Sequence, residues 1–248
     1  RRNRDGSMTY CVGLMLNEGM VCLSDTRTNA GLDNISTYKK MFVFESPGER
    51  VIVVMTAGSL SVSQTTIAEL REMLDEPEPS PDRSILLAPT MLKVAEIIGD
   101  ALARVRSRVD EKLSAMNQGA TASMIVAGQR RGGGMRMFLI YPEGNFIEAT
   151  DDTPFLQIGE HKYGKPILDR VVKKATGLAD AQKAVLLSMD STLRSNLSVG
   201  MPLDLIVIEK DALRVTMQRR IEAGDADFRA MSEAWSNALR ESFTKVSI

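Results

Sequence analysis

Histidine and net charge are both scarce in this chain of 248 residues, which has one histidine and a formal net charge of −1. A single histidine, His161, excludes metal sites built from several histidines and disfavours a Ser-His-Asp triad. A net charge near zero gives no reason to expect a nucleic acid or an anionic membrane as partner. We therefore expect no metal, no cofactor and neither of these partners.

Long apolar runs and a secretory signal are also missing. No apolar run approaches the roughly 20 residues of a membrane-spanning helix. The first seven residues, Arg1 to Ser7, are polar and lead into no apolar segment of the kind found in a signal peptide. These absences predict a cytoplasmic protein. We interpret residues 1–7 as an expression leader in front of a natural Met8, and residues 8–248 as one domain.

A strong hairpin signal stands near the start of the chain. Two apolar runs, 8–16 and 20–27, flank a loop that contains glycine, Asn17-Glu18-Gly19. A three-residue loop would place Asp25 opposite Cys11, and the strands would then pair over most of their length.

That register also places Asp25 diagonal to Thr9, and diagonal cross-strand neighbours lie roughly 7–8 Å apart. Lys40, from the next apolar run, can reach a point between them. A threonine that becomes the chain start once Met8 is removed, with an aspartate and a lysine beside it, is typical of a nucleophile site.

Cysteine is limited to Cys11 and Cys22, which suits a reducing compartment. The expected register puts Cys22 opposite Leu14, so we expect no disulfide between the two cysteines. Cys11 as the nucleophile is an alternative, but no histidine lies near it in the sequence.

The rest of the chain groups its strands and helices into separate blocks. The expected strands cover residues 40–44, 50–55, 122–128, 135–141, 146–149, 155–158, 203–208 and 213–219. The expected helices cover residues 59–74, 91–116, 165–174, 179–190 and 226–245, with loops at 29–37 and 75–89. Segregated blocks indicate an α+β fold with antiparallel sheets and helices packed outside them.

Several short motifs occur together in the first 41 residues. They are Thr9, the Val12-Gly13 pair, the Gly19 turn, Ser24-Asp25-Thr26-Arg27, Thr28-Asn29-Ala30-Gly31 and the Lys40-Met41 step. Together they resemble the N-terminal segment of proteasome β-type subunits, and in particular the bacterial proteasome-like branch called Anbu. The resemblance extends across nearly the whole chain after Met8.

The resemblance implies the four-layer αββα sandwich of N-terminal nucleophile hydrolases, with two antiparallel sheets between helix layers. It further implies a threonine peptidase or amidase that acts on peptides or unfolded proteins. Relatives of this kind self-associate, into a closed ring or an open helical homo-oligomer.

The resemblance also assigns roles to residues of the first half of this chain. Thr9, once Met8 is removed, is the nucleophile, with its own amine as general base. Lys40 disfavours protonation of that amine, and Asp25 holds Lys40 in place. The backbone N–H of Gly58 is the oxyanion-hole donor.

In the second half, Asp190 and Ser198 match the supporting residues of the family, with Ser195 as an alternative. The step Gly159-Glu160-His161 departs from the Gly-Ser that proteasome subunits carry at this point.

Each of these residues also has an ordinary interpretation. Thr9 is then a strand residue, Asp25 a turn carboxylate, Lys40 a surface charge and Gly58 a helix-start glycine. Lys39 and Lys40 point to opposite faces of a strand, so only one of them enters a site. Two other functions stay open: a non-catalytic self-assembling subunit and a non-peptide amidase on the same fold.

Overall fold

The structure is a computed structural model that describes residues 9–29, 35–113 and 120–247. Within these ranges the chain forms five helices and three antiparallel sheets, which confirms the predicted α+β class. The predicted leader, residues 1–7, and Met8 lie outside the described residues. No helix in the described ranges is long and apolar enough to cross a membrane.

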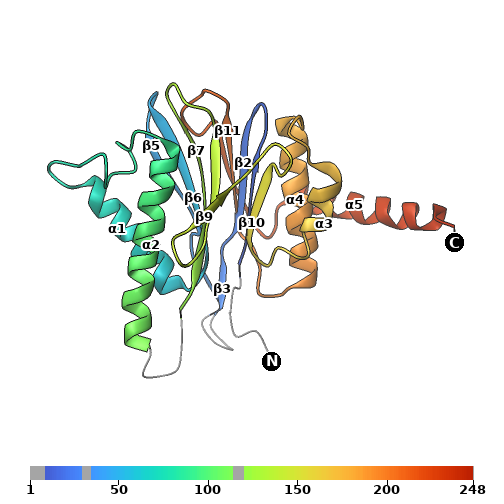
Figure 1. Cartoon of the computed structure of the whole chain (residues 1–248). Helices are drawn as coiled ribbons and strands as arrows, with labels where there is room; N and C mark the ends of the chain where they lie inside the picture. Colours follow the sequence, from blue (N-terminus) through green and yellow to red (C-terminus); the bar gives the residue numbers. More distant parts are fainter. Residues whose placement is uncertain (1–8, 30–34, 114–119, 248) are drawn as a thin grey trace.

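Two five-stranded sheets lie face to face in the centre of the molecule (Figure 1). The first has the order β10-β1-β2-β11-β12, with bounds Phe155–Gly159, Tyr10–Met15, Gly19–Asp25, Leu203–Glu209 and Met217–Ile221. The second runs from β5 to β9 in chain order, with bounds Met41–Ser46, Arg50–Gly58, Ala122–Arg130, Arg136–Ile140 and Phe146–Glu148. A two-stranded sheet pairs β3, Arg27–Asn29, with β4, Ile35–Thr37.

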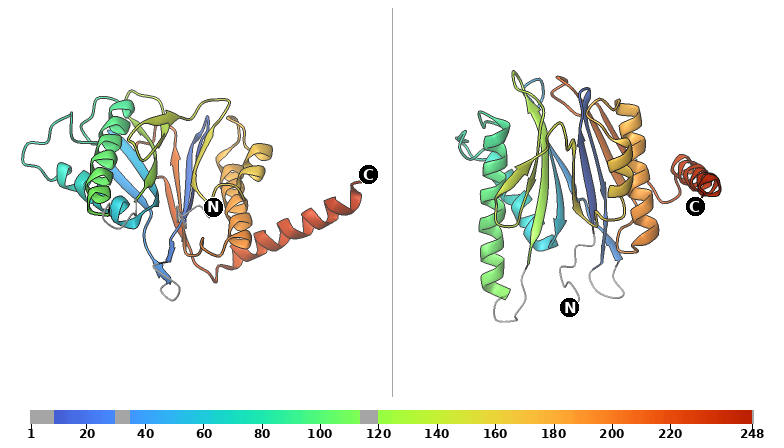
Figure 2. Two further views of the ribbon diagram at one scale, coloured as in Figure 1. Left: turned by 60° about the horizontal axis from the view of Figure 1, so that its bottom comes forward. Right: turned by 45° about the vertical axis from the view of Figure 1, so that its right-hand side comes forward.

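Helices cover the outer face of each large sheet (Figure 1). The second sheet carries α1, Leu60–Leu74, and α2, Met91–Leu113, and the first carries α3, Lys165–Val171, and α4, Leu178–Ser195. The fifth helix, α5, Ala226–Lys245, extends away from this body in Figure 1 and in the left view of Figure 2, and the right view shows it nearly end-on. The layers are therefore helices, sheet, sheet, helices, with one projecting helix.

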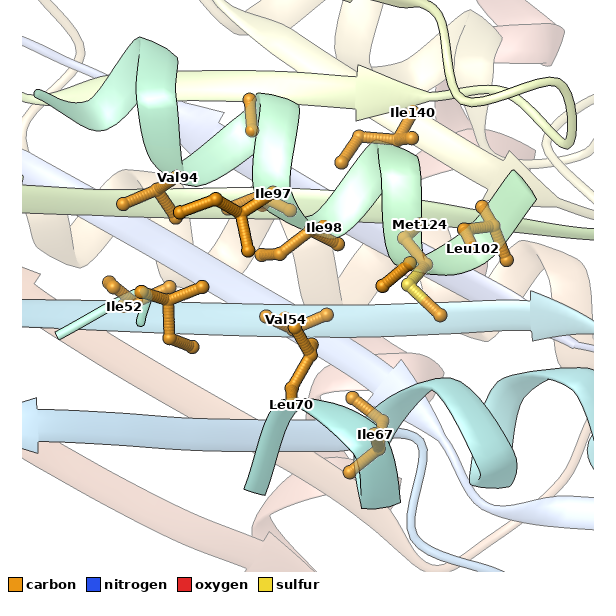
Figure 3. Packing of buried hydrophobic residues seen from close by; sticks show 14 of the residues in the cluster. Ile52, Val54, Ile67, Leu70, Val94, Ile97, Ile98, Leu102, Met124 and Ile140 are labelled. Atoms are coloured by element: carbon orange, nitrogen blue, oxygen red, sulfur yellow. The ribbon is translucent and has the colours of Figure 1, made fainter. Parts of the chain in front are cut away.

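Three apolar cores hold these layers together, because the central strands are buried on both faces. In β6, Ile52 and Val54 pack under α1 and α2 (Figure 3), whereas Val53 and Met55 face the other sheet. This alternation is the period of two expected of a strand. At Gly13 the two sheets approach so closely that a Cβ atom would lie 2.9 Å from the Met137 sulfur.

The register predicted for the first hairpin is wrong by one residue. Ser24, not Asp25, lies opposite Cys11, and Gly13, not Leu14, lies opposite Cys22. The cause is a shorter loop, because the Leu16 N–H donates to the Gly19 carbonyl over 2.8 Å and β2 begins at Gly19 itself. Both cysteines are free, as predicted.

Other elements differ from the predictions mainly at their ends. The predicted loop 29–37 contains the last residue of β3 and the whole of β4, so that prediction is wrong over 35–37, and the predicted helix 179–190 extends to Ser195. The last strand begins only at Met217, because Asp211 and Leu213 adopt positive φ in the turn before it. The predicted helix 91–116 ends within the described residues at Leu113, and 114–116 lie outside them.

Candidate active site

Asp25 is the central side chain of the site, and it is 0% exposed at the end of β2. One carboxylate oxygen accepts the Tyr10 backbone N–H over 3.1 Å. The other accepts the Gly200 backbone N–H over 3.2 Å. The Tyr10 nitrogen belongs to the peptide bond that follows Thr9, so the Asp25 carboxylate lies one peptide unit from Thr9.

Lys40 completes this arrangement immediately before β5. It is buried, whereas its neighbour Lys39 is exposed. The Lys40 ammonium donates to Asp25 over 2.9 Å and to the Arg27 carbonyl over 2.5 Å. Its own carbonyl accepts the Thr56 N–H, which fixes it against β6. The structure thus brings Asp25 and Lys40 together as a buried ion pair.

Electrostatics in this pair are governed by the exclusion of water. Burial raises the pKa of the Asp25 carboxyl above its ordinary value, and Lys40 with the two backbone N–H groups opposes that rise. Desolvation makes such a pair costly, and removing either partner would leave an uncompensated buried charge.

Thr9 is buried beside this pair, at the start of β1. Its carbonyl accepts the Glu160 N–H over 2.8 Å, which ties Thr9 to the chain just after β10. Cys11, two residues on, points to the Thr56 carbonyl between the sheets. Burial and, to a lesser degree, Asp25 raise the pKa of the Cys11 thiol well above its ordinary value, so it is a neutral thiol and a poor nucleophile.

Gly58 ends β6, in the sheet that faces Thr9 across the core. Its φ of 102° is left-handed, and a Cβ atom there would lie 2.4 Å from the Thr121 carbonyl oxygen. Only glycine fits this position. The next residue, Ser59, caps α1 by accepting the Val62 N–H, so the glycine stands where a strand turns into a helix start.

The residues predicted in the second half lie in two different places. Asp190 is buried in α4, where it accepts hydrogen bonds from Ser232 over 2.7 Å and from Arg194 over 3.1 Å. Ser198 bonds to the Asn196 side-chain oxygen, both through its hydroxyl and through its N–H. Ser195, the alternative, is exposed at the end of α4.

Gly200 was not singled out from the sequence, yet it contributes directly to the site. Its N–H binds Asp25, and its carbonyl accepts the Thr26 N–H over 3.4 Å. A Cβ atom on it would lie 2.1 Å from the Arg27 side chain, so a larger residue would require the Arg27 guanidinium to move. The available signal was the position of Gly200 at the end of the segment that contains Ser198.

In the described part of the chain, no group of three or more His, Cys, Asp or Glu side chains is arranged to hold a metal ion. The candidate site itself brings together the Asp25–Lys40 pair, the backbone N–H groups that bind Asp25, and the buried Thr9. These are the groups that acyl-transfer chemistry uses for nucleophile, proton control and charge stabilisation.

No protein-family model and no curated protein sequence matches the chain. Several solved structures do. An Anbu Gly-1 mutant from Hyphomicrobium sp. strain MC1 has 49% identity and a TM-score of 0.90, over 97% of this chain and 98% of its own. Anbu (ancestral beta-subunit) from Yersinia bercovieri covers the same shares with 40% identity and a TM-score of 0.89. The Anbu complex from Pseudomonas aeruginosa, described as a helical assembly, also covers these shares, with 44% identity and a TM-score of 0.91.

Proposed function

The chain belongs to the Anbu family of proteasome-like subunits, and on that premise we propose that it is an N-terminal threonine hydrolase that cleaves peptide bonds. Its nucleophile is Thr9 after removal of Met8, on the four-layer fold of N-terminal nucleophile hydrolases. One observation carries the proposal: the buried Asp25–Lys40 pair is bound to the peptide nitrogen that follows Thr9.

The reaction begins at the Thr9 hydroxyl, which is a weak nucleophile without a base. The free amine of Thr9 has an ordinary pKa of about 7.7–8.0, so near neutral pH a minority of it is unprotonated and can accept the hydroxyl proton. The Lys40 ammonium disfavours a second positive charge nearby and so keeps that amine in its basic form. Asp25 fixes the ammonium where it has this effect.

Attack of the Thr9 oxygen on the substrate carbonyl carbon gives a tetrahedral intermediate with a negative oxygen. The Gly58 N–H stabilises this oxygen, and one such donor contributes roughly 2.7–4 kcal/mol to the rate. The amine returns its proton to the leaving nitrogen as the carbon–nitrogen bond breaks. Water then hydrolyses the resulting ester and restores the hydroxyl.

The test compares two proteins on one panel of peptides and small amides. Protein that begins at Met8 is expected to lose the methionine, to show Thr9 as its first residue by intact mass, and to cleave peptides. Protein that keeps residues 1–8 has an amide nitrogen in place of the base and is expected to be inactive. Full activity in protein that still carries residues 1–8 would refute the mechanism. Cleavage confined to small amides would establish the non-peptide amidase instead.

We propose further that the chain self-associates through α5. Only the first turns of this helix are packed on the body, through Phe228 and Ser232. Its apolar stripe continues into solvent, where Leu239 is 51% and Phe243 is 81% exposed. Apolar residues at this spacing need a partner. The helical assembly of the Pseudomonas aeruginosa relative favours a second copy of the chain as that partner.

The double variant Leu239→Asp, Phe243→Asp tests this interface, with Arg229→Asp on the same helix as control. We expect the double variant to shift to smaller species in light scattering, whereas the control keeps the wild-type mass. An unchanged mass in the double variant would exclude α5 as the interface.

If wild type assembles but never reacts with a threonine-directed acylating inhibitor, the chain is the non-catalytic assembly subunit. The two free, buried cysteines agree with a role in the reducing cytoplasm.

A further inference from the structure

Strand β10 is the edge of the first sheet and pairs on one side only, with β1. The Glu160 N–H donates to Thr9 and the Met15 N–H to Pro154, which fixes the hydrogen-bonded positions of this ladder. In an antiparallel ladder the intervening residues direct their backbone groups to the opposite side. Phe155, Gln157 and Gly159 are those residues, and no strand of the described chain pairs with them there.

A cavity of about 560 Å³ lies against this free edge. It is bounded by the ends of β6, β7, β8 and β10, so it opens between the two sheets. Its volume falls in the usual range of about 300–1,000 Å³ for a ligand site. Ala57, Ala122, Leu139 and Ile158 line it with apolar surface, and polar groups such as Ser123 and His161 complete the lining.

The same cavity reaches the proposed reaction centre. Gly58, the proposed oxyanion donor, is one of its lining residues. Gly159 and His161 also line it, and they flank Glu160, whose N–H binds the Thr9 carbonyl. A substrate in the cavity would therefore touch both backbone segments that border the nucleophile.

We infer that this cavity binds one arm of an extended peptide substrate, which adds as a strand to the free edge of β10. The backbone groups of Gln157 and the N–H of Gly159 supply the main-chain hydrogen bonds, and the apolar lining takes the side chain nearest the scissile bond. Addition of a peptide strand to a sheet edge derives affinity from main-chain bonds and selectivity from side-chain pockets. The inference rests on the proposed function and adds the substrate class, an extended peptide rather than a compact amide.

The Gln157 side chain supports a main-chain role for this residue. Its amide donates to the Tyr10 hydroxyl over 2.7 Å, and that hydroxyl also bonds to Ser188 over 2.7 Å. Burial of Tyr10 raises its pKa to about 12, so the hydroxyl stays neutral and available for both bonds. With the side chain engaged inside the fold, Gln157 offers its backbone to the cavity.

Hydrogen exchange tests this placement on the Thr9→Ala protein, which binds peptide without turning it over. The probes are an eight-residue peptide with leucine at its centre and the compact amide acetyl-leucinamide. We expect the peptide to slow exchange in residues 155–160, and the amide to leave that segment unchanged. Strand β12, the opposite edge of the same sheet, is the internal control and should not change.

Filling the cavity gives an independent measurement. Ser123→Trp should weaken peptide binding by about tenfold or more, whereas Gln218→Trp, an exposed position on β12, should leave it unchanged. If melting shows that Ser123→Trp does not fold, His161→Trp at the exposed rim carries the same expectation. Wild-type affinity in the folded cavity variant, or no protection at 155–160, would overturn the inference.

The inference and the proposed function fail in different ways. Protection of β10 by a peptide that the Met8-start protein never cleaves would leave the inference standing and overturn the hydrolase. Hydrolysis of small amides without protection of β10 by the peptide would support the hydrolase and overturn the inference. Extending the peptide on its amino or carboxyl side alone then shows which arm occupies the cavity.

Discussion

Asp25 and Asp190 are both buried carboxylates that family resemblance marks as site residues, yet their surroundings differ in kind. Asp25 accepts two backbone N–H groups, one from each half of the chain, and a buried lysine. Asp190 accepts a serine from α5 and the guanidinium of Arg194, whose side chain is half exposed. One carboxylate is thus fixed by the main chain around Thr9, and the other joins α4 to α5.

This difference shows that burial of a carboxylate does not by itself identify its role. The partners of Asp25 leave it few alternatives to contact with Lys40, since backbone donors hold both of its oxygens. The partners of Asp190 account for it as a connection between two helices. The family resemblance predicts a supporting catalytic role for Asp190, whereas its contacts favour a structural one, and substitution can decide between the two.

The largest effect on kcat is expected at Thr9, the proposed nucleophile next to Asp25. Thr9→Ala in a protein that begins at Met8 should lower kcat by about 10³-fold or more, because it removes the nucleophile. Loss of a hydroxyl at this position should leave the melting temperature close to that of wild type. Thr9→Ser should retain part of the activity, and equal rates in wild type and Thr9→Ala would end the assignment of Thr9.

Lys40→Met is expected to have the next largest effect, about 10²–10⁴-fold on kcat, because it removes the charge that controls the Thr9 amine. It also leaves the buried Asp25 carboxylate unpaired, which costs about 3–5 kcal/mol in the free energy of unfolding. Lys39→Met is the matched control, since Lys39 is exposed. If Lys39→Met lowered kcat and Lys40→Met did not, Lys39 rather than Lys40 would be the lysine of the site.

Asp25→Asn and Asp190→Asn compare the two regions directly. Asp25→Asn should lower kcat about 10- to 100-fold, the range for residues that orient a reacting group. Asp190→Asn should leave kcat unchanged and lower the free energy of unfolding by about 1–3 kcal/mol through the bonds to Ser232 and Arg194. Ser232→Ala should reproduce the stability loss alone. If Asp190→Asn lowered kcat and Ser232→Ala did not, Asp190 would contribute to catalysis itself.

Local sequence patterns predicted most of the fold but not the geometry of the site. Apolar periodicity located the helices and strands because burial of a strand or helix face leaves a repeat in the sequence. The first hairpin register depended on whether Gly19 belongs to the loop or to β2, and composition alone does not decide that. The error moved the expected partner of Asp25 by one residue.

Contacts between distant segments are far harder to predict from local sequence patterns. Gly200 reaches Asp25 across 175 positions of sequence, and only the folded chain shows that Gly200 lies against the Arg27 side chain. Likewise, the pattern of α5 predicted a helix, but not that most of it would stand clear of the rest of the described residues. Sequence patterns report which faces are apolar, and the fold decides what covers them.

The pH dependence of activity gives a smaller test of the Asp25 region. Because the folded pKa of Asp25 is raised, its carboxylate takes up a proton above the ordinary value near 3.9 as the pH falls. Two groups, the Thr9 amine and Asp25, then inactivate the enzyme, so the slope of log kcat against pH should change from about one to about two. A raised folded pKa means that this protonation favours the folded state. As the pH falls, activity should therefore be lost in a pH range where protonation of Asp25 does not lower the melting temperature. A slope of log kcat against pH that stays at one would show that Asp25 does not titrate in this range.

The smallest effect on kcat is expected for Ser198→Ala. This variant tests whether the segment that contains Ser198 and Gly200 acts through the Ser198 side chain or through its backbone. The Ser198 hydroxyl bonds to Asn196, whereas the contact of this segment with Asp25 is made by the backbone of Gly200. Loss of one partly buried hydrogen bond costs about 0.5–1.5 kcal/mol of stability, and kcat should stay within about threefold of wild type. Gly200→Ala is the contrasting variant, because its Cβ would push the Arg27 side chain aside next to the N–H that binds Asp25. If Ser198→Ala lowered kcat as much as Asp25→Asn does, the hydroxyl would act on the reaction itself and the segment would be more than a backbone support.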